Sequence, residues 1–408
     1  MGFGKASFQL RIADCGVRGV CMMVLRDNND VQNLATEFPI TQTSAYLNTA
    51  AQGPWPARTV QAVQRAAEHA QYLEFDRAHG EPAIFLETRT RLAKLLNVQP
   101  DDLVFGPNTT YGLNVCVHGI DWRAGDNLVV PHNEFPSVQY ALAHLQKLGV
   151  DVRSAAWQGS GPTVDQIMAR FDARTRAVIC SAIAWDTGYR MDLETLGARC
   201  EAAGCLLIVD GIHAVGAECL DLAALRVSAL SFHGYKWLMA GFGAGVLYVA
   251  PSAVDRIGPS FIGPQGVMGN QMAVQADLPW KPGAQRYSAG TGNQIGATAL
   301  NASLTLIEGI GIAHISTHNH ELASLLADGL KRCLPDARLL RSSEPKHQSA
   351  IVVFTTGNSH RDAALVDHLG ANGVVVALRP AGIRVAPHLF NTAQDIEKLL
   401  GCVETWRM

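Results

Sequence analysis

Hydrophobic and polar positions follow two different periods along this chain, and segments with the two periods alternate. Apolar residues recur three and four positions apart at 57–75 and 83–96, which predicts two amphipathic helices. Short continuous apolar runs appear further on, and such runs predict buried strands. The runs lie at 103–105, 127–131, 177–183, 206–209, 229–232 and 245–249.

Stretches with helical periodicity separate most of these predicted strands, at 110–117, 137–148, 163–171 and 193–203. This alternation is typical of an α/β fold in which a mainly parallel sheet is covered by helices on both faces. A long helix predicted at 299–309 leads into further helices and strands. We therefore expect an N-terminal extension at 1–45, a large domain at 46–297 and a smaller C-terminal α+β domain at 298–408.

The composition narrows the class of protein. Of the 408 residues, 48% are hydrophobic and 17% are charged, which is typical of a soluble globular enzyme. A net charge of -3 without a long basic run argues against a nucleic-acid partner, and no apolar stretch reaches the roughly 18 residues of a membrane span. The nine cysteines are scattered without a C-x-x-C pair, which indicates a reduced, cytoplasmic protein rather than a disulfide framework or a zinc site.

Chemically active residues gather where predicted strands end. Asp210 ends one apolar run, and Lys236 follows the next run within His233-Gly234-Tyr235-Lys236. Ligands of open parallel sheets bind beyond the carboxyl ends of the strands, so these side chains are expected at one crevice. Either residue alone is more often an ordinary loop cap or a surface charge. Together they match the needs of pyridoxal phosphate (PLP): an amine that holds the aldehyde as a Schiff base and a carboxylate that keeps the pyridine nitrogen protonated.

Other strand-end residues allow two interpretations each. Thr109 and Thr110 open a helix, where hydroxyls and backbone amides could cradle a phosphate or where a threonine could act only as an N-cap. Phe135 could stack on a flat ring or lie in the core. His213 could donate to a phenolic oxygen or be structural. Arg384, in a strand-like run, could clamp a carboxylate through two hydrogen bonds or form a surface salt bridge.

The chain resembles the class V aminotransferases, a family of fold type I PLP enzymes that includes cysteine desulfurases, isopenicillin N epimerase-like proteins and kynureninases. The most specific match is Asp210-x-x-His213 together with Tyr235-Lys236-Trp237-Leu238. The segments at 46–51 and 384–392 resemble the opening and closing segments of the family, so the resemblance covers nearly everything after residue 45.

The resemblance implies a role for each matching residue. Lys236 would form the Schiff base, Asp210 would pair with the pyridine nitrogen, His213 would contact the cofactor oxygen and Phe135 would stack on the ring. The implied phosphate contacts are Thr109, Thr110, His233, Tyr235 and, from the neighbouring subunit, Thr291. A contact from the neighbour implies a homodimer with shared active sites. Arg384 would hold the α-carboxylate of an amino-acid substrate, with Asn48 near the same wall.

The implied reaction passes through an external aldimine, from which the freed Lys236 removes the α-proton. Transamination of the class V type is our first expectation, and β-elimination by a C–S lyase is the close alternative. Epimerisation and kynureninase-like hydrolysis follow. A persulfide-forming desulfurase is disfavoured because the stretch at 374–383, where the family's nucleophilic cysteine would lie, contains no cysteine. A PLP-fold regulator without activity is also disfavoured, since the lysine is present and no DNA-binding segment is appended.

Overall fold

The computed structural model describes residues 34–72, 81–157, 159–269 and 279–407. Most of the extension expected at 1–45 and the end of the helix expected at 57–75 therefore lie outside the described residues. Within the described part, no single helix is long and apolar enough to cross a membrane, and one pair of helices passes that test only together, with a bend of 79° between them.

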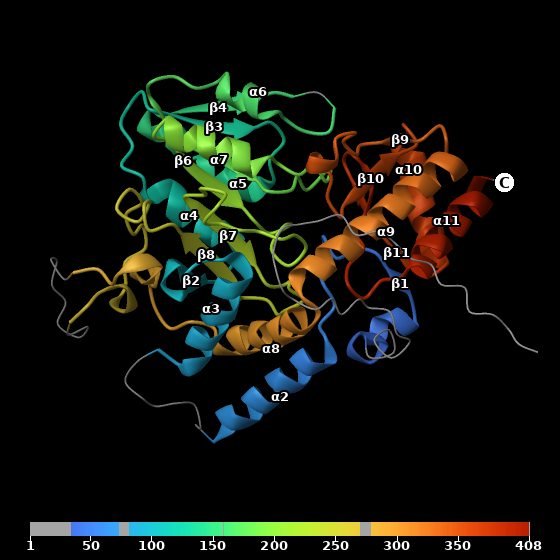
Figure 1. Cartoon of the computed structure of the whole chain (residues 1–408), viewed down its shortest axis with the longest axis horizontal. Coiled ribbons are helices and arrows are strands. Elements are labelled where there is room, and N and C mark those ends of the chain that lie inside the picture. Colours follow the sequence, from blue (N-terminus) through green and yellow to red (C-terminus); the bar gives the residue numbers. More distant parts are fainter. Residues whose placement is uncertain (1–33, 73–80, 158, 270–278, 408) are drawn as a thin grey trace, which may run out of the picture.

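A mixed seven-stranded sheet forms the centre of the molecule (Figure 1). In spatial order its strands are β2 (Leu103–Gly106), β8 (Gly245–Val249), β7 (Ala229–His233), β6 (Leu206–Asp210), β5 (Thr175–Ser181), β3 (Asn127–Pro131) and β4 (Asp151–Ala155). The last five are mutually parallel, whereas β8 runs antiparallel to both of its neighbours. The predicted α/β class is confirmed, and all six predicted strands are present.

Strand β4 was missed by the sequence patterns for a physical reason. It lies at the edge of the sheet, and its residues Asp151, Arg153 and Ser154 are not buried. An edge strand that is only partly buried needs no continuous apolar run, so the pattern that marks β6 and β7 is missing here. Every residue of β6 and β7 is buried, in contrast.

Helices alternate with the strands as the sequence predicts, and several of them pack on the central sheet. In chain order they are α2 (Ala57–Gln71), α3 (Ala83–Leu96), α4 (Thr109–Gly119), α5 (Pro136–Leu142), α6 (Val164–Met168), α7 (Leu193–Ala202), α8 (Gln294–Ile310), α9 (Ile312–Cys333), α10 (Ser359–Ala371) and α11 (Ala393–Arg407). Helix α4 packs on β6, β7 and β8, whereas α2, α3 and α8 pack together below the sheet in Figure 1. The position of α4 matters most, because its first turn meets the carboxyl ends of β6 and β7.

The C-terminal part builds a second core around a four-stranded antiparallel sheet, drawn in orange and red in Figure 1. Its strands are β12 (Ala377–Arg379), β13 (Gly382–Val385), β10 (Val352–Thr355) and β9 (Arg338–Leu339). The early strand β1 (Ala45–Tyr46) pairs in parallel with β11 (Val374–Val375), so the chain enters the large sheet by way of this second core. The expected domain boundary at residue 298 stays a prediction.

Candidate active site

Asp210 and Lys236 lie at the carboxyl ends of neighbouring parallel strands, and both are buried. Asp210 is the last residue of β6 and is 3% exposed, and its Oδ1 accepts a hydrogen bond from the backbone N–H of Ile212 at 3.0 Å. Lys236 follows β7 by three residues and is 6% exposed. The interpretation of Lys236 as a surface lysine is therefore wrong. Burial raises the pKa of Asp210 to about 6.

The backbone at Gly53 lies directly against the loop that contains Lys236. The N–H of Gly53 donates to the carbonyl of Tyr235 at 2.8 Å. A Cβ at position 53 would lie 2.1 Å from the carbonyl oxygen of Lys236, closer than any side chain tolerates. Only glycine allows the N-terminal segment to pass this close, and that segment therefore helps to set the direction of the lysine.

Lys236 and His213 face each other inside the site. The Nζ of Lys236 lies 3.4 Å from Nε2 of His213, while the indole N–H of Trp237 donates to Nδ1 of the same ring at 3.4 Å. An indole nitrogen can only donate, so Nδ1 accepts and the neutral ring carries its proton on Nε2. Burial keeps the ring neutral, because it lowers the pKa of His213 well below its usual range.

About half of the Lys236 side chains carry a neutral amine at pH 7. Burial is the main cause, and it lowers the pKa of Lys236 to about 7. Asp210 opposes the shift by favouring the charged amine, whereas Arg384 adds to it. A lysine must be neutral to attack an aldehyde or to accept a proton, so the pocket prepares this side chain for both.

The first turn of α4 provides a place for an anion. Asn108 is the N-cap, and its Oδ1 accepts from the backbone N–H of Tyr111 at 2.9 Å. Thr110 donates its hydroxyl proton to the Oγ of Ser137 at 2.8 Å. The Oγ1 of Thr109 is buried and has no hydrogen-bond partner within the described residues. Such a group is costly unless a ligand satisfies it, and a helix N-terminus favours an anionic ligand.

Aromatic rings form a wall of the same pocket. Phe135 is 37% exposed, and its ring lies edge-on to Trp185 with 5.6 Å between the centroids. The Nζ of Lys236 lies 5.8 Å from the centroid of Phe135 and 5.6 Å from that of Tyr235. The indole N–H of Trp185 donates to the carbonyl of Asn133 at 3.1 Å, which fixes the wall. A flat ring bound beside Lys236 would meet the exposed face of Phe135.

Arg384 approaches the pocket from the C-terminal sheet. It lies within β13, is 2% exposed, and donates from Nη1 to the carbonyl of Trp185 at 2.9 Å. Its Nε is buried and lacks a partner in the described structure, and the same holds for Oδ1 of Asn48. Burial lowers the pKa of Arg384 to about 9. A buried guanidinium with unused donors is the kind of group that a carboxylate ligand satisfies.

Most of the residues predicted for the site meet in one pocket. Its lining consists of Asn108, Thr109, Thr110, Phe135, Ser137, Ser181, Trp185, Asp210, Ile212, His213, Tyr235 and Lys236. His233 is buried next to this lining but outside it, with ring nitrogens 3.2 Å and 3.1 Å from the backbone nitrogens of Tyr235 and Gly243. Thr291 is exposed and does not reach the pocket of its own chain. The individual roles implied for these residues stay predictions.

Sequence reasoning missed Ser181 and Glu134. The predicted strand extended to residue 183, which concealed that Ser181 ends β5 and faces the pocket. Glu134 stands directly before Phe135, but nothing in its neighbours indicates that it is buried at 7% exposure. An acidic residue in a loop is normally solvated, so its burial could not be read from the local pattern.

The described residues fit PLP. The unpartnered hydroxyl of Thr109 at a helix N-terminus suits the phosphate, the buried Asp210 suits a protonated ring nitrogen, and Lys236 supplies a near-neutral amine within the same pocket. These are three different chemical requirements, and the pocket meets all of them.

Comparisons with known proteins agree with this fit. The family model for class V aminotransferases matches residues 45–399. An uncharacterised protein of Schizosaccharomyces pombe is 30% identical over 78% of this chain and 73% of its own length. A probable cysteine desulfurase of Methanothermobacter thermautotrophicus is 26% identical over 92% of this chain and 97% of its own.

The fold also matches that of C-DES, a cystine C–S lyase. A variant of C-DES with glycine covalently linked to the PLP cofactor superposes with a TM-score of 0.81 at 23% identity, covering 91% of this chain and 98% of its own.

Proposed function

This chain belongs to the class V aminotransferase family and is a PLP-dependent enzyme, and from that premise we propose that it cleaves a carbon–sulfur bond of an amino acid by β-elimination. When bound, PLP holds the substrate amino group and delocalises the electron pair left by the α-proton. The observation that carries the proposal is the buried Lys236, whose amine has a pKa near 7 and lies 3.4 Å from His213.

Asp210 and Lys236 from the pocket lining, and Arg384 from outside it, would have different roles that follow from their charges. Asp210 would hold the proton on the pyridine nitrogen, because a buried anion stabilises that cationic group. Lys236 would take the α-proton of the substrate as a neutral amine. Arg384, whose buried Nε has no hydrogen-bond partner in the described structure, would fix the substrate α-carboxylate and so orient the bond to the α-proton.

The thiol chemistry of the chain favours direct elimination over persulfide formation. A relative that aligns with 92% of this chain is a probable cysteine desulfurase, which supports a sulfur-containing substrate. The pocket, however, is lined by no cysteine, and the nearby Cys180 on β5 is buried, with a pKa that burial raises well above its usual range. A thiolate that could accept sulfur is therefore missing from the described pocket.

In this reaction, the bond between the β-carbon and sulfur breaks, and its electron pair leaves with the sulfur. The proton that Lys236 has taken from the α-carbon is then available to the leaving thiolate or the product. Water completes the reaction by releasing a keto acid and ammonia. No external oxidant or reductant is required.

Transamination is the second candidate, because the matching family model is that of class V aminotransferases. It shares the first step, and Lys236 would then return the proton to the cofactor carbon rather than release it. The two reactions differ in what they require: elimination needs no keto-acid acceptor, whereas transamination stops after its first half-reaction without such an acceptor.

The experiment incubates the PLP-loaded protein with cysteine, cystine and other single amino acids, with Lys236→Ala as control. Elimination predicts repeated release of sulfide or thiol, keto acid and ammonia without an acceptor. Stoichiometric pyridoxamine phosphate that disappears when a keto acid is added would instead establish transamination. Failure to exchange the α-proton of any amino acid in D2O would contradict both.

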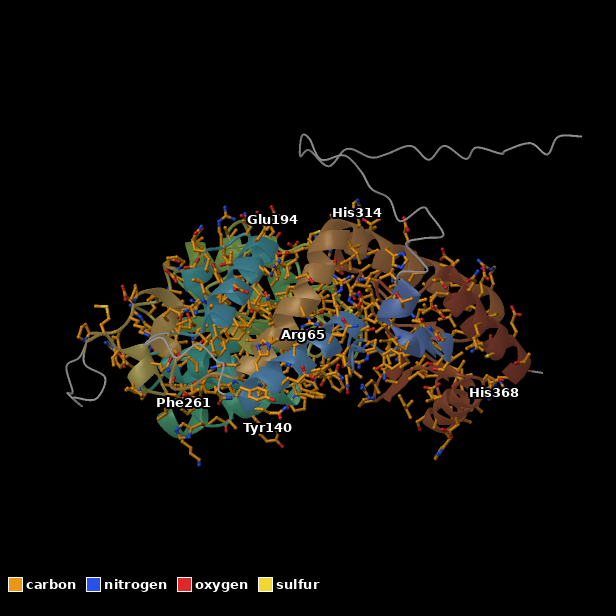
Figure 2. The ribbon with its side chains drawn as sticks, turned by 90° about the horizontal axis from the view of Figure 1, so that it is seen from below. Arg65, Tyr140, Glu194, Phe261, His314 and His368 are labelled. Carbon is orange, nitrogen blue, oxygen red and sulfur yellow. The ribbon has the colours of Figure 1, made fainter. Side chains whose placement is uncertain are left out.

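We further propose that two copies of the chain share their active sites. Large apolar side chains are exposed on the large domain: Tyr140 (79%), Phe242 (61%), Phe261 (48%) and Ile262 (69%). Tyr140 and Phe261 lie along the same lower edge in Figure 2. Burying this surface against a second copy would stabilise a dimer. Mixed dimers of Lys236→Ala and Thr291→Val chains should regain activity that neither variant has alone, if Thr291 reaches the partner's pocket.

A further inference from the structure

Glu134 is a second buried carboxyl group, and like Asp210 it lies where the parallel strands of the central sheet end. Its Oε1 accepts from the backbone N–H of Ser181 at 2.7 Å, and its Oε2 accepts from the hydroxyl of Ser181 at 2.5 Å. The backbone N–H of Phe135 adds a longer contact of 3.4 Å. The loop after β3 is thereby tied to the last residue of β5.

Ser181 connects this carboxylate to the pocket. It lines the pocket, and it is the register partner of Asp210 across the parallel pair β5 and β6. The carboxyl group of Glu134 is therefore separated from the pocket by one side chain. Burial raises the pKa of Glu134 to about 7, the hydrogen bonds from Ser181 lower it, and the charge of Asp210 raises it.

A purely structural role does not explain the choice of residue. Burying an ion costs several kcal/mol, and an amide or an apolar contact ties two strands at lower cost. The hydrogen bonds from Ser181 recover part of that cost, and above its pKa of about 7 Glu134 places a second negative charge next to Asp210. The charge is explained if the pocket holds a cation that two anions stabilise better than one.

We propose that Glu134, acting through Ser181, is a positioning residue that stabilises the positive charge of the lysine-bound cofactor. This inference rests on the proposed PLP function. Because the hydroxyl of Ser181 donates to Glu134, the serine presents its lone pairs, and not its proton, to the pocket. The carboxylate thus acts directly as a charge and indirectly by orienting the serine.

Other charged and titratable groups also face this region from the elements packed around it. They are Asp210 and His213 after β6, Tyr235 and Lys236 after β7, Cys180 on β5, and Arg379 and Arg384 from β12 and β13. The two arginines disfavour a positive charge at Lys236, whereas Asp210 favours it. A negative charge on Glu134 would favour a cation in the pocket as Asp210 does, so its removal should lower the pKa of the lysine-bound nitrogen.

The test loads wild type and Glu134→Gln with PLP and follows the visible absorption band of the lysine-bound cofactor from pH 5 to 10. The glutamine keeps the shape and one hydrogen bond but removes the charge. A cation in the pocket lowers the pKa of Glu134 below the value of about 7 that burial gives it, and so keeps its carboxylate ionised. The midpoint of the band should therefore fall by about one pH unit in Glu134→Gln, the effect of one charge at a separation of roughly 10 Å in an effective dielectric of about 20. Glu134→Asp, which keeps the charge, should stay near wild type.

Asp362→Asn is the matched control. Asp362 is also a buried carboxylate that accepts several hydrogen bonds, from Thr355 and Thr356, but it belongs to the C-terminal core and lines none of the pocket. Its substitution should reduce the melting temperature without moving the midpoint. A structural role for Glu134 predicts the same pattern for Glu134→Gln.

A midpoint in Glu134→Gln within 0.3 pH units of wild type, a deviation well below the roughly one unit expected from a lost charge, would overturn the inference while leaving the PLP function intact. If Glu134→Gln does not fold, Ser181→Ala decides instead: loss of the oriented lone pairs should lower its midpoint, and an unchanged midpoint overturns the proposal. Wild type that takes up no PLP, and therefore shows no band, would overturn the proposed function and this inference together.

Discussion

Capture of PLP by the apoprotein should depend on pH with a midpoint near 7, the pKa to which burial lowers Lys236. Only the neutral amine attacks the aldehyde. A shift from the usual 10.5 to about 7 corresponds to about 5 kcal/mol favouring the neutral form. At pH 8 about 90% of Lys236 is then neutral, against about 0.3% of an ordinary lysine, so capture gains roughly 300-fold from this effect.

The assay mixes apoprotein with PLP in a stopped-flow instrument and records the growth of the visible band between pH 5.5 and 9.5. Lys236→Ala gives the background from other amines. Asp210→Asn tests the sign of the electrostatics: Asp210 raises the pKa of Lys236, so its neutralisation should move the midpoint below that of wild type. A wild-type midpoint above pH 9, or an upward shift in Asp210→Asn, would refute the reasoning.

Three further predictions concern single contacts. Thr109→Val removes a buried hydroxyl that lacks a partner in the described structure, so it should not lower the stability of the apoprotein and should raise it slightly. It should weaken PLP binding about tenfold, or about 1.4 kcal/mol, and an unaltered Kd in a fluorescence titration would contradict this. Gly53→Ala places a methyl group 2.1 Å from the carbonyl oxygen of Lys236 and should lower the free energy of unfolding in urea by about 2 kcal/mol or more. In the control Gly309→Ala the new methyl group meets no atom within 4 Å, so the free energy of unfolding should not fall. Glu218→Gln weakens the hydrogen bonds to the partly exposed His320 and Arg190, so it should lower the free energy of unfolding by about 1–2 kcal/mol. The PLP absorption band should not change, and a changed band would show that Glu218 acts on the pocket.

The periodicity of the chain was sufficient to predict six of the seven strands of the central sheet, because strands buried on both faces must be continuously apolar. Strands β3 and β8 have the predicted bounds, and β6 and β7 differ by one residue at the end. The ends of these strands carry Asp210 and Lys236, so the same local pattern that predicts the fold also places the two residues together. Their implied chemistry agrees with the family that the comparisons show.

The sequence determined which residue types stand at the strand ends, because hydrophobic periodicity is a local property and the parallel topology brings those ends to one edge. Only the tertiary structure decided what surrounds them. The proton on Nε2 of His213 depends on the indole of Trp237, and the burial of Glu134 depends on Ser181, 47 residues further along the chain. Contacts of this kind leave no periodic trace, since each is a single distance between side chains on different elements. Burial in the folded structure shifts the pKa values of Asp210, His213 and Lys236 away from the usual values of these residue types.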